Sequence, residues 1–266
     1  MTAHAWMPQS PCGVGCLQDE SAVAPLRQAL RVVALVVVVL AAPLCLLGGR
    51  RWWFRAVLKA VGAKLRIIGE AEKHGGVLVV GNHTSWMDIV AVNAVQPARA
   101  LAKGEVRDWP VIGALAKRAG TVFVDRAKLS ALPATVEELA GVLRGGAAVS
   151  VFPEGTTWCG RESGHYKPAA FQAAIDAGVP VRPLALRFVV GGKPTTATAF
   201  LGEETFLAAL QRTVALRGLE IEVHVLPLID SGGQTRRSLA VRAEESVRTV
   251  AEDRDRAASG CTPHWS

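Results

Sequence analysis

Two different patterns of apolar and polar residues divide the 266-residue chain at about residue 76. Beyond it, short apolar runs, typical of buried strands, alternate with longer helix-like segments. We expect strands at residues 77–80, 121–124, 147–152, 181–186 and 221–226, with a weaker one at 99–102. We expect helices near residues 89–94, 111–119, 133–144, 169–177, 206–216 and 237–252. This alternation predicts an α/β fold with a mostly parallel or mixed central sheet flanked by helices.

The N-terminal part has another character. Residues 1–24 lack periodicity and are predicted to be a disordered tail, whereas residues 25–70 are predicted to be a membrane-anchoring helical segment. Its centre, residues 32–49, contains no charge and is near the lower length limit of a membrane-spanning helix. Pro43 can kink this run, so a re-entrant or shallow helix remains an alternative. Residues 71–253 are expected to form one domain, and residues 254–266 a loose C-terminal tail.

Basic residues flank the uncharged run unequally. Arg27 and Arg31 precede it, and a larger group follows it: Arg50, Arg51, Arg55, Lys59, Lys64 and Arg66. We expect the protein at the cell membrane, and the positive-inside rule predicts that its main domain lies on the cytoplasmic side. Segment 53–65 repeats Trp53, Val57, Val61 and Leu65 at intervals of four and is predicted to be an amphipathic interfacial helix on anionic lipids. The alternative is a helix whose apolar face packs on the domain core.

The amino-acid composition limits the classes of molecule that the protein is expected to bind. Half of the residues are hydrophobic, the formal net charge is +7 and the isoelectric point is about 9.5. This balance suits an anionic membrane, a phosphorylated substrate or nucleic acid. Nucleic acid is not expected, because the basic residues cluster beside the membrane segment without interleaved aromatic residues along a groove.

The five cysteines are scattered and odd in number, which does not indicate a disulfide framework and favours a reducing compartment. Cys12 and Cys16 lie close together, but His4 is the one further ligand candidate nearby in the sequence. We therefore expect no metal site.

The sharpest chemical feature is His83 followed by Asp88, directly after the strand predicted at 77–80. A neutral imidazole can take a proton from an alcohol near pH 7. A carboxylate on its other ring nitrogen fixes the tautomer and stabilises the imidazolium. The alternative is a turn histidine next to a helix N-cap.

Basic residues follow two other strand-like runs. Arg126 comes at the end of the strand predicted at 121–124, and Lys103 closes the weaker strand. A guanidinium in such a place can hold a phosphate through two parallel hydrogen bonds, and a lysine can add a second positive charge. The alternatives are a surface pair of Asp125 with Arg126 and a solvated Lys103.

Another candidate is Glu154, which is followed by Gly155 and Thr156 after the apolar run 147–152. Gly155 allows a tight turn, so that Glu154 is presented at the edge of the sheet to accept hydrogen bonds or to hold an arginine. The alternative is a structural turn. The stretch around Arg182 is read mainly as a buried scaffold strand, and Lys167 is a further possible anion contact before a helix.

In their order and separation, these stretches resemble the four motifs of the glycerolipid acyltransferases, of which the bacterial 1-acyl-glycerol-3-phosphate acyltransferases are the most similar type. The residues concerned are 82–88, 120–126, 152–156 and 179–183. The resemblance covers roughly residues 76–190 and makes 71–253 an acyltransferase domain.

The resemblance implies roles for these residues. His83 is the general base for the acceptor hydroxyl, and Asp88 orients it. Arg126, with Lys103, binds the acceptor phosphate. Glu154, Gly155 and Thr156 help to hold the acceptor. The acyl donor is expected to be acyl-CoA or an acyl carrier protein, as a co-substrate, with no metal and no other cofactor.

Other functions stay open at this point. Some relatives acylate lyso-ornithine lipid, and the stretch 102–110 also resembles theirs. An acyl-thioester hydrolase would use water in place of the alcohol, but water does not require a phosphate site. A non-catalytic membrane-docking protein would have no use for His83 and Asp88.

Overall fold

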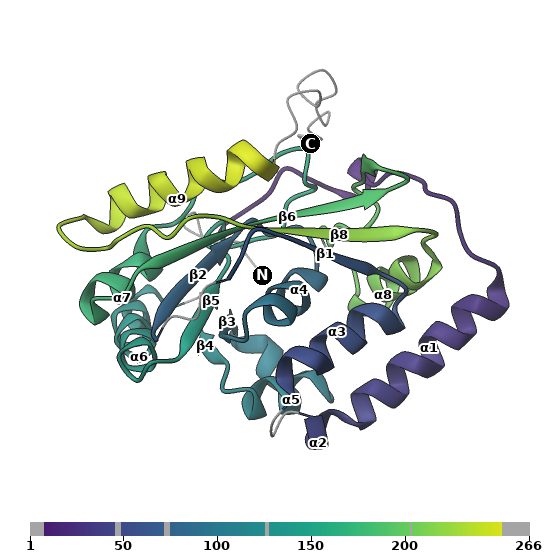
Figure 1. Cartoon of the computed structure of the whole chain (residues 1–266), viewed down its shortest axis with the longest axis horizontal. Helices are drawn as coiled ribbons and strands as arrows, with labels where there is room; N and C mark the ends of the chain where they lie inside the picture. The colour runs from purple at the N-terminus through teal and green to yellow at the C-terminus, as the bar shows by residue number, and fades with distance from the viewer. Residues whose placement is uncertain (1–7, 46–48, 72–74, 126–127, 203, 252–266) are drawn as a thin grey trace.

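The structure is a computed structural model, and it describes residues 8–45, 49–71, 75–125, 128–202 and 204–251. One mixed sheet runs through the molecule in the order β1-β8-β6-β2-β5-β3-β4, with β7 paired to β6 (Figure 1). The strands are β1 (Lys64–Ile68), β2 (Val77–Gly81), β3 (Arg99–Lys103), β4 (Val122–Val124), β5 (Ala148–Val151), β6 (Val181–Val190), β7 (Lys193–Pro194) and β8 (Leu219–Val225).

The central strands β6, β2, β5, β3 and β4 are parallel, whereas β8 is antiparallel to β6. The mostly parallel, mixed sheet predicted from the sequence is therefore confirmed. In parallel strands the carboxyl ends meet at one edge, which is where α/β proteins place their ligands.

Helices cover both faces of the sheet (Figure 1). They are α1 (Pro25–Leu40), α2 (Ala42–Cys45), α3 (Arg50–Ala60), α4 (Met87–Val95), α5 (Ile112–Arg118), α6 (Leu132–Arg144), α7 (Ala169–Ala177), α8 (Phe206–Ala215) and α9 (Arg236–Ala251). Short 3-10 turns occur at η1 (Val14–Cys16), η2 (Gly104–Asp108) and η3 (Leu129–Ala131). Helices α6, α7 and α9 pack on one face, and α3, α4 and α8 on the other.

Strand β2 shows how the sheet divides the core. Val77 and Val79 face the cluster formed with α3 and α4, whereas Leu78 and Val80 face the cluster formed with α6, α7 and α9. A strand that is buried on both faces is expected to be apolar at every position, as β2 is.

Two expectations about residues 53–65 are wrong. Val57 and Val61, which were predicted to lie on the membrane, are buried against the sheet, so this face of α3 is the core-facing one. The segment also ends in an unexpected strand, β1, in which Lys64 and Arg66 pair with the carboxylates of Glu220 and Glu222. The strand was not predicted because exposed charged residues interrupt its apolar residues, as is common in a strand at the edge of a sheet.

The uncharged run 32–49 does not form one helix. Helix α1 ends at Leu40 and α2 begins at Ala42, because Pro43 lacks an N–H and its ring conflicts with a continuous helix. Among the helices of the described ranges, none has the length and apolar character needed to cross a bilayer.

Residues 8–24 differ from the predicted disordered tail. Cys12, Cys16 and Val23 are buried, and Gln18 exchanges hydrogen bonds of 2.9 Å with Thr196. The apolar residues of this segment follow no helical or strand period, but several of them pack against Cys159, Ala199 and Leu201. Residues 1–7 and the predicted loose tail 254–266 lie outside the described residues.

Candidate active site

The carboxyl end of β2 carries the predicted histidine. Just before it, the Asn82 side chain donates to the Leu186 carbonyl oxygen at 2.9 Å and accepts from the Leu186 N–H at 2.8 Å. These two bonds continue the pairing of β2 with β6 after the regular ladder ends. The backbone that enters His83 is thereby fixed to the sheet.

His83 and Asp88 meet as predicted. The two residues are joined by a contact of 2.8 Å between His83 Nδ1 and Asp88 Oδ2. Asp88 lies in the first turn of α4 and is fully buried. Its Oδ2 also accepts the N–H groups of Thr84 at 2.6 Å and Ser85 at 2.8 Å. A carboxylate accepts only, so Nδ1 carries the proton and Nε2 is the basic nitrogen.

A third contact fixes the plane of the imidazole. Phe152, the residue after β5, stacks on His83 with ring centroids 4.4 Å apart and an angle of 13° between the planes. Asn82 and Phe152 both belong to the motifs noted in the sequence, but neither received a role there. The sequence signal that could have indicated their roles is that Asn82 and Phe152 each come directly after a buried strand.

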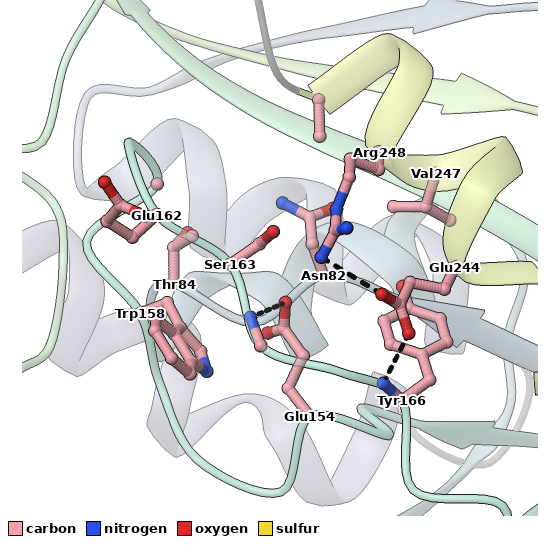
Figure 2. Close-up of a pocket in the computed structure, with 13 residues that line it drawn as sticks. Asn82, Thr84, Glu154, Trp158, Glu162, Ser163, Tyr166, Glu244, Val247 and Arg248 are labelled. Atoms are coloured by element: carbon pink, nitrogen blue, oxygen red, sulfur yellow. Dashed lines mark hydrogen bonds and ion pairs between the residues drawn. The ribbon is translucent and has the colours of Figure 1, made fainter. Parts of the chain in front are cut away.

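Glu154 lies beside His83 and accepts a hydrogen bond from its backbone N–H. The residue is 3% exposed, and its Oε2 accepts the His83 N–H at 2.8 Å. Its Oε1 faces the Gly164 N–H at 3.4 Å (Figure 2). Burial raises the pKa of Glu154 to about 8, although the hydrogen bonds from His83 and Gly164 act in the opposite direction. These contacts make Glu154 a positioning residue for His83.

The loop after Glu154 returns to the histidine. The Gly155 N–H donates to the Phe152 carbonyl at 3.1 Å, and Gly155 has φ +80°. A Cβ at this glycine would come within 2.6 Å of Pro8. Thr156 follows, half-buried, and the Trp158 N–H then donates to the His83 carbonyl at 2.8 Å. The backbone around His83 is thus held from both sides.

Of the two predicted phosphate contacts, the structure describes one. Lys103 is exposed at the carboxyl end of β3, in register with Val124 of β4. Strand β3 lies two positions from β2, or about 10 Å. Because β2 and β3 run parallel, Lys103 lies at the same edge of the sheet as His83. Arg126, two residues after β4, lies outside the described residues.

Two further residues stand apart from the catalytic pair. Arg182 is buried in the middle of the sheet opposite Val79, in agreement with a scaffold strand, and not at the edge with His83. Lys167 is exposed shortly before α7, and its N–H donates to the Pro153 carbonyl at 2.8 Å.

A small pocket lies between the loop after Glu154 and α9 (Figure 2). Glu244 of α9 joins the two sides, since it accepts the Tyr166 N–H at 2.8 Å. It also pairs with Arg248 of the same helix at 3.0 Å. His83 is not among the residues that line this pocket. The pocket therefore lies beside His83 and Asp88 and not over them.

This geometry can support general base catalysis at a hydroxyl group. The buried carboxylate holds the imidazole in the tautomer whose Nε2 can take a proton, and no protein nucleophile is required. The neighbouring lysine at the same edge suits an anionic group on the molecule that carries the hydroxyl.

The comparisons with known proteins agree with this class. The family model "Acyltransferase" matches residues 64–187. The chain is 37% identical to a 1-acyl-sn-glycerol-3-phosphate acyltransferase of Neisseria meningitidis, over 75% of this chain and 79% of the relative. It is 36% identical to a lyso-ornithine lipid O-acyltransferase of Pseudomonas aeruginosa, over 74% and 76%.

The fold also has a solved counterpart. The crystal structure of the 1-acyl-sn-glycerophosphate acyltransferase PlsC from Thermotoga maritima superimposes with a TM-score of 0.57, at 20% identity, over 85% of this chain and 96% of that one. The chain belongs to the acyltransferase family in which these glycerolipid and lyso-lipid enzymes are found, and it is an acyltransferase.

Proposed function

We propose that the protein transfers a fatty acyl group from an acyl thioester to the free hydroxyl of 1-acyl-glycerol-3-phosphate, giving phosphatidate for phospholipid biosynthesis. The observation that carries this proposal is the 2.8 Å contact of His83 with a buried Asp88 at the sheet edge that also bears Lys103. The donor is acyl-CoA or an acyl carrier protein.

The reaction follows from the tautomer of His83. Nε2 takes the proton of the acceptor hydroxyl while the oxygen attacks the thioester carbonyl carbon. The tetrahedral intermediate then collapses, the carbon–sulfur bond breaks, and the thiolate takes the proton from the imidazolium. General base catalysis of this kind contributes about 10²–10⁴-fold.

The acceptor phosphate is assigned to Lys103 and Arg126. Lys103 is exposed about two strand spacings from the strand that carries His83. The side chain of a lysine together with the length of a glycerol phosphate bridges this separation. Arg126 follows the neighbouring β4 in the sequence and would add a bidentate contact.

The comparisons give one specific reason for a second candidate acceptor. The relatives named for 1-acyl-sn-glycerol-3-phosphate and for lyso-ornithine lipid are similar to this chain to nearly the same degree. The ornithine head group carries one carboxylate and one amino group in place of a phosphate, so it offers less negative charge to two cations. Arg126 in addition to Lys103 favours the phosphate-bearing acceptor, whereas Lys103 alone does not discriminate, because the stretch 102–110 resembles both kinds of relative. The same two cations argue against an acyl-thioester hydrolase.

Membrane attachment is proposed through the outer face of α1. Apolar side chains at successive helical turns are exposed there: Leu26, Leu30, Val33, Val37 and Leu40. On the inner face, the Arg31 guanidinium donates to the carbonyls of Val214 and Leu216 at 2.7 Å. An amphipathic helix fixed in this way can lie in the headgroup region of a bilayer.

Helix α3 adds a second membrane contact. The Trp53 Nε1–H donates to the Val38 carbonyl of α1 at 2.8 Å, which joins the two helices. Trp52 is exposed on the outer side of α3, and the Arg55 guanidinium lies 5.2 Å from its ring centroid. Trp and Arg are favoured at an anionic membrane surface. We assign the protein to the cell membrane, with its catalytic domain on the cytoplasmic side.

The acceptor and the donor are tested together. Purified protein is assayed with lysophosphatidate, lyso-ornithine lipid and water as acceptors, each with acyl-CoA and with acyl carrier protein thioesters. We expect phosphatidate to be the main product. A preference for lyso-ornithine lipid would replace the proposed acceptor, and thioester hydrolysis without transfer would remove the proposed function.

A further inference from the structure

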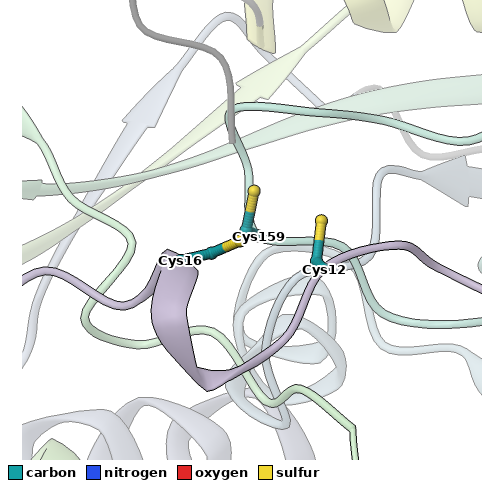
Figure 3. Close-up of side chains that lie close together, drawn as sticks. All are labelled: Cys12, Cys16 and Cys159. Carbon is teal, nitrogen blue, oxygen red and sulfur yellow. The ribbon is translucent and has the colours of Figure 1, made fainter. Parts of the chain in front are cut away.

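Three cysteines that lie far apart in the sequence meet in one buried cluster (Figure 3). In the N-terminal segment, Cys12 precedes the short turn η1 and Cys16 is the last residue of that turn. Cys159 belongs to the loop that follows Glu154. All three are at most 9% exposed, and their sulfur atoms all lie within 4.8 Å of one another. No function assigned above uses these thiols.

The spacing fits metal coordination. A Zn–S bond is about 2.3 Å long, so thiolates on one tetrahedral ion lie about 3.8 Å apart. Separations within 4.8 Å exceed this value by about 1 Å at most, and side-chain rotation on binding would have to close that difference. The surroundings are apolar, with Ala199 and Leu201 buried against the cluster and Leu17 and Trp158 partly buried beside it. Metal coordination would stabilise thiolates in such a place, where isolated charges are costly.

A disulfide explains the cluster less well. It would use two of the three thiols and leave the third buried beside it. An acyltransferase domain on the cytoplasmic side would also be in a reducing compartment, where structural disulfides are rare. A metal ion uses all three sulfur atoms at once.

We propose that Cys12, Cys16 and Cys159 together bind one soft d10 cation, Zn²⁺ or Cu⁺, through three thiolates. Thiolate ligands select these ions over harder cations. Three sulfur atoms can complete the coordination of Cu⁺, whereas Zn²⁺ would need a fourth ligand that these three cysteines do not supply. The sequence did not indicate this site, because only the fold brings Cys159 to Cys12 and Cys16.

The ion would join the N-terminal segment to the loop that holds the catalytic histidine. Cys159 directly follows Trp158, whose N–H donates to the His83 carbonyl at 2.8 Å. Pro8 lies against Gly155 in the same loop. The site is therefore structural, and it does not depend on which lyso-lipid is the acceptor.

The test measures binding and not activity. Metal-free, reduced protein is titrated with Zn²⁺ against a chromophoric chelator, and anaerobically with Cu⁺ against bicinchoninate. We expect one equivalent of one of these ions to bind, and X-ray absorption to show three sulfur ligands. Cys16→Ser should lower the affinity by at least about 100-fold. The control Cys45→Ser/Cys261→Ser, which removes the other two cysteines of the chain, should bind normally.

Hydrogen exchange provides a second readout that does not depend on a stable variant. In the wild-type protein, the ion should slow exchange in residues 8–24 and 152–160 and leave α6 unchanged. The proposal is overturned if neither ion binds stoichiometrically, if oxygen or nitrogen ligands replace the sulfur shell, or if the folded Cys16→Ser protein binds as the wild type does.

Discussion

Asp88 accepts the Nδ1–H of His83 at the same oxygen that accepts two backbone N–H groups, with the His83 contact at 2.8 Å. The carboxylate is fully buried, so its charge acts on the imidazole with little screening by water. This relationship sets the tautomer of His83, and in the proposed mechanism it would stabilise the imidazolium that forms during acyl transfer.

Asp88→Asn should lower kcat by about 10²–10⁴-fold with little change in either KM. The amide oxygen can keep the three donors of Asp88 Oδ2, but it carries no charge to stabilise the imidazolium. The measurement is steady-state acyl transfer, with circular dichroism to confirm folding. Asp176→Asn is the control, since Asp176 is exposed and its hydrogen bond in the described structure is with the half-buried Gln172. Activity near that of wild type in Asp88→Asn would contradict the orienting role.

Glu154 should make the stability of the protein depend on pH. Its pKa is about 8 in the folded protein, against an ordinary value of 4.5. Between these pH values the folded protein holds one proton more than the unfolded chain, so the free energy of unfolding should fall as pH rises. The loss is absent below pH 4.5, is complete above pH 8 and amounts to at most about 5 kcal/mol.

Glu154→Gln should therefore flatten this pH dependence. Urea unfolding at pH 5, 6, 7 and 8 measures it, and Glu138→Gln on the exposed face of α6 is the control that should keep the slope of the wild type. An unchanged slope in Glu154→Gln would show that Glu154 is charged throughout this range.

Lys103→Ala and Arg126→Ala should each raise the KM for lysophosphatidate by about 10–100-fold, the usual effect of losing a charge-assisted hydrogen bond. The KM for the acyl donor should change little, because the lost contact is to the acceptor phosphate. Arg144→Ala is the control, since Arg144 ends α6 and precedes the opposite, amino-terminal edge of β5. Equal effects on both substrates would remove the phosphate role.

Leu30→Glu and Val37→Glu on α1 should each weaken binding to anionic vesicles by about tenfold or more, because each removes apolar area from the proposed membrane face. Cosedimentation with vesicles measures the effect. Val241→Glu is the matched control, because Val241 is similarly exposed but belongs to α9 on the other face of the sheet. If all three variants bind vesicles equally, α1 is not the attachment surface.

The parts of the fold that were predictable are those with a local pattern. Strand β2 is apolar throughout because both of its faces are covered, and His83 and Asp88 can meet because only a turn separates them. Strand β1 was missed because Lys64 and Arg66 interrupt its apolar residues.

The parts that were not predictable depend on long-range contacts. Glu154 was expected to hold the acceptor, and that role stays a prediction. Its hydrogen bond to the backbone of His83 was not foreseen, because no side-chain pattern reveals it. Cys159 joins Cys12 and Cys16 only in the folded chain. The face of α3 was misassigned because a helix on a membrane and a helix on a core have the same apolar period.

The central claim is that His83 is the base in acyl transfer. The most direct measurement is the single-turnover rate of acyl transfer to lysophosphatidate by His83→Ala, compared with His165→Ala, whose imidazole is exposed and pairs with Glu244. We predict a rate about 10²–10⁴-fold below that of wild type for His83→Ala, with vesicle binding unchanged, and a normal rate for His165→Ala. A folded His83→Ala protein that transfers the acyl group at the rate of the wild type would contradict the mechanism.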